Sequence, residues 1–152
     1  MEIGNPAPDF TMATDTAGEV SLKSLSGQKF VLYFYPKDDT PGCTKEAIGF
    51  TESAAEFEKL NVQIIGVSKD TVAKHEKFRA KHSLSVQLAS DEDGATCEAF
   101  DVWVEKNMYG RKYMGIERAT FLVDGEGIVR SIWKKVKVKD HVESVLAAAT
   151  DL

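Results

Sequence analysis

The chain has 152 residues, of which 43% are hydrophobic and 28% are charged, and its formal net charge is −5. This length and balance are typical of a single globular domain, here expected to span residues 1–152. The negative net charge argues against nucleic acid as the main partner, because phosphate backbones attract basic surfaces.

The chain also lacks the usual signs of export or membrane insertion. Met1 to Phe10 contains no basic start followed by an apolar run, so we expect no signal peptide. The longest apolar run, Phe30 to Tyr35, is far too short to cross a bilayer, and we expect no membrane partner. Two cysteines cannot build a disulfide framework, which favours a reducing, cytoplasmic compartment.

The first part of the chain predicts a short hairpin, a strand and a helix. Thr11 to Leu25 is rich in turn residues and predicts the N-terminal hairpin. Lys29 to Tyr35 is an unbroken aromatic and β-branched run that stops at Pro36, as expected of a buried strand. A helix is expected from about Pro41 to Leu60. Its apolar stripe, at spacings of three and four, consists of Ala47, Phe50, Ala54 and Phe57.

The middle of the chain continues the alternation of strands and helices. Val62 to Val67 reads as the next buried strand, and Thr71 to Lys81 as a helix with Asp70 as its N-cap. Val86 to Ala89 is expected to form a short strand. Asp93 to Phe100 is expected to be helical.

The last part predicts two strands and a helix. Ala119 to Val123 and Ile128 to Trp133 are the strands, and Asp124-Gly125 between them is a hairpin signal. The last helix is expected to begin near Asp140, where Glu143 completes a capping-box pattern. Its expected buried face consists of Val142, Val145, Leu146 and Ala149. This order of elements predicts a layered α/β domain with a mixed sheet, because crossovers pair strands in parallel and the hairpin adds an antiparallel edge.

The most informative segment follows the first buried strand. Thr40 is a good N-cap residue and Pro41 suits the first helical position, which places Cys43 at the third position, N3. Free backbone amides and the helix dipole at this end favour negative charge, so a cysteine here is predisposed to form a reactive thiolate. Gly42 would let a ligand approach the backbone closely. The alternative is that Cys43 is a small buried hydrophobe.

This segment resembles the active-site signature of peroxiredoxins, in which a proline, a threonine and a cysteine are spaced as Pro36, Thr40 and Cys43 are here. The run from Tyr33 to Ala47 is similar to the bacterioferritin-comigratory, or Q-type, subfamily. Three further segments are similar: Ala7 to Phe10, Gly66 to Asp70 and Gly115 to Asp124. The resemblance covers nearly the whole chain. It implies a thioredoxin-like three-layer fold with a mixed central sheet and an N-terminal hairpin.

The resemblance also implies an activity and the residues that perform it. The chain would be a thiol-dependent peroxidase that reduces hydrogen peroxide and organic hydroperoxides, with Cys43 as the attacking thiolate. Arg118 would hold the thiolate and polarise the peroxide, and Thr40 would offer its hydroxyl to both. Pro36 would shield the thiolate from water. Glu46 matches the position that orients the arginine. The implied partner is an external thiol reductant.

The chain departs from its relatives where the sulfenic acid formed on Cys43 would be resolved. The two positions at which relatives carry a resolving cysteine hold Ile48 and Ser83, and the sequence leaves open that such a cysteine was removed by engineering. Cys97 is expected to be a buried packing residue, with a resolving role as the alternative. We therefore expect a one-cysteine cycle that uses thioredoxin, a glutaredoxin or glutathione. A disulfide reductase and a redox sensor or chaperone are the competing functions.

Several other features receive a structural interpretation. His75, His82 and His141 show no metal-ligand spacing with the cysteines, so we expect no metal or cofactor and place each histidine at the surface. Trp103 and Trp133 are expected to be packing residues. A basic cluster is expected to be solvated, with docking of an acidic partner protein as the alternative; it consists of Arg130, Lys134, Lys135, Lys137 and Lys139. We expect a monomer or a weak dimer.

Overall fold

The structure, a computed structural model, describes residues 1–16 and 18–152. Its strands are β1 (Thr11–Thr14), β2 (Glu19–Ser21), β3 (Lys29–Phe34), β4 (Val62–Ser68), β5 (Gln87–Ser90), β6 (Trp103–Met108), β7 (Arg111–Ile116), β8 (Ala119–Val123) and β9 (Val129–Trp133). Its helices are the 3-10 helix η1 (Lys23–Leu25), then α1 (Pro41–Glu52), α2 (Ala54–Lys59), α3 (Val72–His82), α4 (Ala95–Ala99) and α5 (His141–Thr150).

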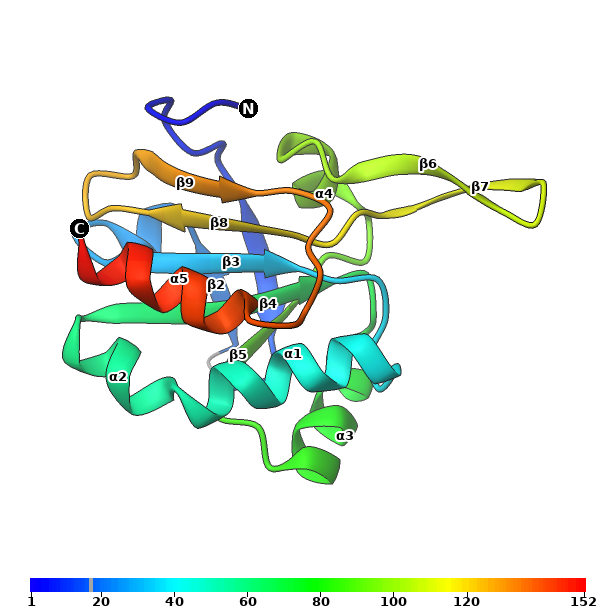
Figure 1. Cartoon of the computed structure of the whole chain (residues 1–152), viewed down its shortest axis with the longest axis horizontal. Coiled ribbons are helices and arrows are strands. Elements are labelled where there is room, and N and C mark those ends of the chain that lie inside the picture. Colours follow the sequence, from blue (N-terminus) through cyan, green and yellow to red (C-terminus); the bar gives the residue numbers. More distant parts are fainter. Residues whose placement is uncertain (17) are drawn as a thin grey trace.

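Seven of the described strands form a mixed sheet in the order β2-β1-β5-β4-β3-β8-β9 (Figure 1). β3, β4 and β5 pair in parallel, because helical crossovers connect them. The remaining pairs are antiparallel, including the N-terminal hairpin of β1 and β2 and the late hairpin of β8 and β9. The predicted mixed sheet and N-terminal hairpin are confirmed.

The side chains of β3 alternate between two hydrophobic cores, one on each face of the sheet. Phe30, Leu32 and Phe34 pack into a core that also contains α4 and the N-terminal strands. Val31 and Tyr33 pack into the other core, which α1, α2, α3 and α5 cover. Figure 1 shows these four helices together on one side of the sheet. This is the predicted three-layer arrangement.

The long helix predicted from Pro41 to Leu60 is divided in two. α1 ends at Glu52, and Ser53 has φ −96° and ψ 7°, outside the helical region. The change of direction brings Phe57 fully into the core but leaves Ala54 only half-buried. The predicted apolar stripe is therefore right for three of its four members.

The cap of α3 is also different from the prediction. The Thr71 hydroxyl accepts a hydrogen bond from the Lys74 amide at 3.2 Å, so Thr71 is the N-cap and not Asp70. The Asp70 carboxylate instead accepts hydrogen bonds from the Asp38 amide and the Ser68 hydroxyl. The Asp70 side chain, predicted to cap the helix, thus binds groups outside α3 instead.

The hairpin predicted at Asp124-Gly125 is confirmed, since β8 and β9 pair antiparallel. Gly127 is the residue with positive φ in this connection, and the Asp124 carboxylate accepts hydrogen bonds from the amides of Glu126 and Ile128. The capping box of α5 is not formed, since Asp140 has a φ of 60° and its side chain does not cap the helix. The buried face of α5 is as predicted, with Leu146 only partly buried.

The sequence analysis missed the ribbon of β6 and β7, which projects from the body of the molecule (Figure 1). Its residues pair from Trp103↔Ile116 to Met108↔Arg111. Tyr109 and Gly110 at the tip both have positive φ, the geometry of a tight hairpin turn. The ribbon is largely exposed on both sides, so it lacks the apolar alternation that marks a half-buried strand.

No helix among the described residues is both long enough and apolar enough to cross a membrane.

Candidate active site

The first turn of α1 lies at the carboxyl end of β3, where open α/β sheets bind ligands. Thr40 has extended backbone angles, Pro41 is the first helical residue and Cys43 is at N3, as predicted. The Thr40 side chain does not cap the helix, because its hydroxyl donates to the Lys37 carbonyl at 2.9 Å. The amides of Gly42 and Cys43 thus receive no side-chain acceptor from Thr40.

Arg118 reaches this helix start because of the register between β3 and β8. Ala119 pairs antiparallel with Phe34, so the residue before β8 lies beside the end of β3. From there the Arg118 Nη2 donates to the Cys43 Sγ at 3.3 Å, and its Nη1 donates to the Glu46 Oε1 at 2.8 Å. Cys43 is 1% exposed and Glu46 is 0% exposed. The structure therefore brings the guanidinium of Arg118, which is distant in sequence, to a thiol and a carboxyl group that lie one helical turn apart on α1.

Burial and mutual charge shift the pKa values of Glu46 and Arg118, which together with Cys43 form a triad. Burial raises the pKa of Glu46 to about 7, although Arg118 opposes that shift. Burial alone would lower the pKa of Arg118, but the negative charges of Glu46 and Cys43 raise it above its usual value. Among the described residues, the buried side-chain atoms without a hydrogen-bond partner are Glu46 Oε2 and Tyr33 OH. Burial, and then the charge of Glu46, raise the pKa of this tyrosine well above its usual range.

A histidine that the sequence analysis placed at the surface lies beside the carboxyl group. His141 is 5% exposed, its Nε2 contacts the Thr120 hydroxyl at 2.8 Å, and the same atom is 3.9 Å from Glu46 Oε2. Burial, and then the positive Arg118, lower the pKa of His141 to about 4. The burial of His141 could have been predicted from the sequence, because it is four residues before the apolar Val145 and shares its helix face.

Two further residues approach Arg118 closely. A Cβ placed on Gly42 would lie 3.1 Å from the Arg118 Nη2. The group that approaches the backbone closely at Gly42 is therefore the Arg118 guanidinium. On the projecting ribbon, the Lys106 side chain packs over Gly115. Burial, and then the positive Arg118, lower the pKa of Lys106, and the negative charge of Cys43 acts against that shift. The missed ribbon thus brings a second cation toward the site.

The other predicted site positions lie around the triad. Pro36 is exposed at the end of the β3 segment, Ile48 is half-buried on α1, and Ser83 is exposed at the left-handed C-cap of α3. Cys97 is fully buried on α4, as predicted, and belongs to the core on the opposite face of the sheet from Cys43. Both cysteines are free thiols. Burial, followed by a hydrogen bond with Asp91, raises the pKa of Cys97.

The surface assignment of the histidines is wrong for His75 as well as for His141. His75 is 0% exposed, whereas the His82 side chain is partly exposed. The spacing of α3 explains this, because His75 is three residues before the buried Phe78 on the same face. Among residues 1–16 and 18–152, no group of three or more His, Cys, Asp or Glu side chains could hold a metal ion.

The tryptophans are half-buried packing residues, as expected. Trp103 packs against one core, and the Lys69 Nζ lies 4.2 Å from its ring centroid. Trp133 packs against the other core, with its ring centroid 5.8 Å from that of His141.

Comparison with known proteins supports what this geometry indicates. Residues 3–132 match the family model described as the AhpC/TSA family. The chain belongs to the AhpC/TSA family. Peroxiredoxin Bcp of Bacillus subtilis is 49% identical over 152 residues, which is 100% of this chain and 97% of that protein. Peroxiredoxin Bcp of Xanthomonas campestris is 48% identical over 145 residues, covering 94% of this chain and 91% of that protein.

Solved structures of this family have the same fold. A structure of the Xanthomonas campestris bacterioferritin comigratory protein, described as giving insight into its alkyl peroxide reduction activity, has a TM-score of 0.89 and 45% identity. The match covers 93% of this chain and 90% of that one. A cysteine-to-serine variant of Xylella fastidiosa PrxQ has a TM-score of 0.93 and 37% identity, over 99% of this chain and 96% of that one. The chain is thus a thioredoxin-like peroxiredoxin of the Bcp/PrxQ type, a thiol-dependent peroxidase.

Proposed function

We propose that Cys43 performs the peroxidase chemistry in a one-cysteine cycle, reducing hydrogen peroxide and organic hydroperoxides. The observation that carries this proposal is the contact of 3.3 Å between the Cys43 Sγ and the Arg118 Nη2 at the start of α1. A guanidinium and a helix N-terminus both act on this one sulfur, and positive charge beside a cysteine favours the thiolate as the attacking form.

The proposed reaction begins with attack of the Cys43 thiolate on one peroxide oxygen. The S–O bond forms as the O–O bond breaks, and the other oxygen leaves with the electron pair of that bond and takes up a proton from solvent to become water or an alcohol. The sulfur is oxidised to a sulfenic acid, and the peroxide is reduced. Arg118 donates to the charge that moves onto the leaving oxygen, and the free amides of the first turn of α1 serve the same purpose.

Three further residues would assist this step. Glu46 fixes the Arg118 guanidinium through the hydrogen bond of 2.8 Å, which leaves the second arm of the guanidinium for the sulfur. The Thr40 hydroxyl, which donates to Lys37 in this structure, would turn toward the bound peroxide. Pro36, at the exposed end of the β3 segment, would limit water access to the sulfur.

An external thiol would then return Cys43 to its reduced state. Ile48 and Ser83 occupy the positions where relatives carry a resolving cysteine. Cys97 packs into the core on the far side of the sheet, so a Cys43–Cys97 disulfide would require the layers to separate. These placements favour thioredoxin, a glutaredoxin or glutathione as the reductant, which is consistent with work in a reducing cytoplasm.

The test compares two single-cysteine variants. Cys43→Ser should abolish thiol-driven peroxide turnover, whereas Cys97→Ser should keep it within about a factor of two. Mass spectrometry of the oxidised wild-type protein should find a sulfenic acid on Cys43. A Cys43–Cys97 disulfide together with loss of turnover in Cys97→Ser would overturn the one-cysteine cycle. Full turnover in Cys43→Ser would overturn the whole proposal.

A further inference from the structure

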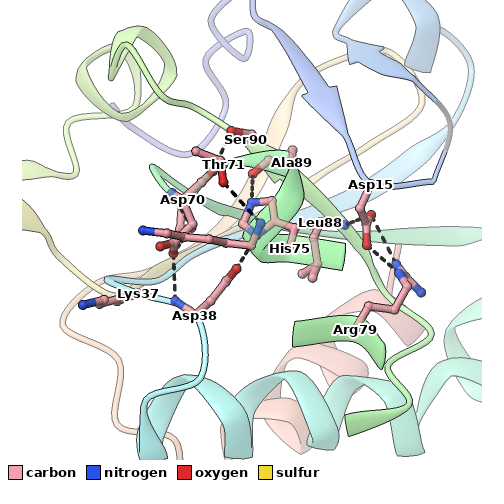
Figure 2. A network of polar contacts seen from close by, with 12 residues as sticks. Asp15, Lys37, Asp38, Asp70, Thr71, His75, Arg79, Leu88, Ala89 and Ser90 are labelled. Carbon is pink, nitrogen blue, oxygen red and sulfur yellow. Dashed lines mark hydrogen bonds and ion pairs between the residues drawn. The ribbon is translucent and has the colours of Figure 1, made fainter. Parts of the chain in front are cut away.

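The buried His75 of α3 is not used by the chemistry proposed above, yet it contacts the loop that leads to Cys43. Figure 2 shows its ring between Asp38, in the loop after β3, and Ala89, on β5. The His75 Nδ1 is 2.6 Å from the Asp38 Oδ2, and its Nε2 is 2.9 Å from the Ala89 carbonyl oxygen. The Asp38 side chain is 6% exposed.

These two contacts determine the charge of the ring. A carbonyl oxygen can only accept, so the Nε2 carries a hydrogen. The other nitrogen faces a carboxylate, and the proton between them belongs on the imidazole, whose ordinary pKa is higher than that of a carboxyl group by roughly 2.5 units. His75 is therefore an imidazolium. Burial alone would lower its pKa, but the hydrogen bond and charge of Asp38, the Ala89 carbonyl and the charge of Asp70 raise it.

Asp38, which pairs with His75, also makes hydrogen bonds that fix the loop before α1. Its Oδ1 accepts from the Tyr35 hydroxyl at 2.6 Å, and its own amide donates to the Asp70 Oδ2 at 2.8 Å. Burial and the charge of Asp38 raise the pKa of Tyr35, so this phenol remains a donor. Asp38 is two residues before Thr40, the N-cap residue of α1. The loop is thus held by Tyr35 just after β3, by Asp70 between β4 and α3, and by His75 on α3.

A second, outer contact joins the end of α3 to the same loop. The Lys81 Nζ is 2.6 Å from one Asp39 oxygen, and the His82 Nε2 is 2.8 Å from the other. Asp39 is 40% exposed, so this pair is screened by water and contributes less than the buried one. The inner contact, between His75 and Asp38, is therefore the stronger of the two.

We infer that His75 is a positioning residue for the peroxidase reaction: it keeps the Cys43 loop closed for peroxide, and its release opens the loop to the reducing thiol. The inference rests on the proposed function of Cys43. The two half-reactions place opposite demands on the loop. Attack on peroxide needs the Cys43 Sγ beside Arg118, whereas an external thiol must reach a sulfur that is 1% exposed.

The test replaces His75 by glutamine, which retains a donor but not the charge, and Asp38 by asparagine. Stopped-flow measurement gives the rate of Cys43 oxidation by peroxide, and a second mixing gives the rate of sulfenic acid reduction by glutathione. In both variants we expect oxidation to be at least about tenfold slower and reduction faster than in the wild type. The double variant should be little worse than either single variant, because both remove the same contact.

The matched control is Asp15→Asn, which weakens the other buried ion pair of α3. The Asp15 Oδ2 is 2.5 Å from the Arg79 Nε, on the part of α3 away from the Cys43 loop (Figure 2). This variant should lower the thermal stability without moving the two half-reactions in opposite directions. If His75→Gln instead slows both half-reactions together, its effect is a general loosening of the fold and the inference is wrong.

The pH dependence supplies an independent readout. The imidazolium contact should be fully present below the ordinary histidine pKa near 6.5 and lost as the pH rises through the raised pKa of His75. We expect hydrogen-exchange protection of the amides of residues 37–44 to fall over that range in the wild type and to be independent of pH in His75→Gln. Equal pH dependence in the two proteins would overturn the inference. A wild-type protein whose Cys43 reacts like a free thiol would instead overturn the proposed function.

Discussion

At the scale of single residues, the closest fit in the site is between Gly42 and Arg118. The guanidinium passes close over the helix start, where a Cβ on Gly42 would lie 3.1 Å from the Arg118 Nη2 and would crowd it. The same nitrogen donates to the Cys43 Sγ. The glycine thus gives the arginine its space, whereas its backbone angles are open to other residues because its φ is not positive.

This fit predicts the effect of Gly42→Ala. The added methyl group should displace the Arg118 Nη2 by a few tenths of an ångström and weaken its hydrogen bond to sulfur. We expect the rate of Cys43 oxidation to fall about 10- to 100-fold, less than the roughly 100- to 1000-fold seen when such a donor is removed outright, because the hydrogen bond is weakened and not lost. The melting temperature should change little, because alanine is a better helix former than glycine. An unchanged oxidation rate would show that the Arg118 contact is not needed.

At the scale of elements, α1, β8 and α5 meet around Glu46. They bury two titratable groups, Glu46 and His141, whose pKa values shift in opposite directions. Burial raises the pKa of Glu46 to about 7, so the folded protein binds a proton here more readily than the unfolded chain. Burial lowers the pKa of His141 to about 4, so at that site the folded protein binds a proton less readily. The two groups are 3.9 Å apart, between Oε2 and Nε2.

Because the two pKa shifts have opposite signs, their effects on the free energy of unfolding should cancel. As the pH falls from 6.5 to 5, Glu46 adds to the free energy of unfolding and His141 subtracts from it, each on the order of 1 kcal/mol. The contribution of this pair in the wild type should therefore be nearly flat over that range. Glu46→Gln removes only the stabilising part, so its free energy of unfolding should fall relative to the wild type by about that amount. Urea unfolding at pH 6.5 and pH 5 measures both.

At the scale of the whole molecule, charge is distributed unevenly. The chain has a net charge of −5, but the connection from β9 to α5 carries the exposed cations Lys134, Lys135, Lys137 and Lys139. Arg130 is separate from them, because it pairs with Asp124 at 2.6 Å. The connection passes the active site, since the Val136 amide donates to the Arg118 carbonyl at 2.9 Å. Its side chains line a hollow of about 440 Å³ with Trp133 and His141.

A charge-reversal variant distinguishes the two interpretations of these lysines. We expect simultaneous Lys→Glu substitution at the four exposed positions to leave the rate of Cys43 oxidation within about twofold, because water and salt screen the charges of exposed side chains. Turnover with thioredoxin and with glutathione should change equally little if the connection is a solvated surface. A selective loss of turnover with the protein reductant would show that this segment docks an acidic partner.

The sequence alone determined the alternation of strands and helices, the mixed sheet and the position of Cys43 at the start of α1, because local features specify all of them. Buried runs such as Lys29 to Tyr35, the Thr40-Pro41 helix start and the spacing of α5 act within a few residues. The ribbon of β6 and β7 was missed because its exposed strands carry no apolar pattern. The resemblance to peroxiredoxins, and not periodicity, pointed to Arg118 and Glu46.

Only the tertiary structure decided which polar groups meet inside the molecule. The β3–β8 register brings Arg118 to Cys43 and Glu46, and the packing of α5 brings His141 to the same carboxyl group. It also buried His75 against Asp38, two residues that are 37 positions apart. Such contacts depend on how layers pack, and a side chain's charge follows from its burial and its partners. That is why two histidines expected at the surface are both buried, one with its pKa raised beside Asp38 and one with its pKa lowered to about 4.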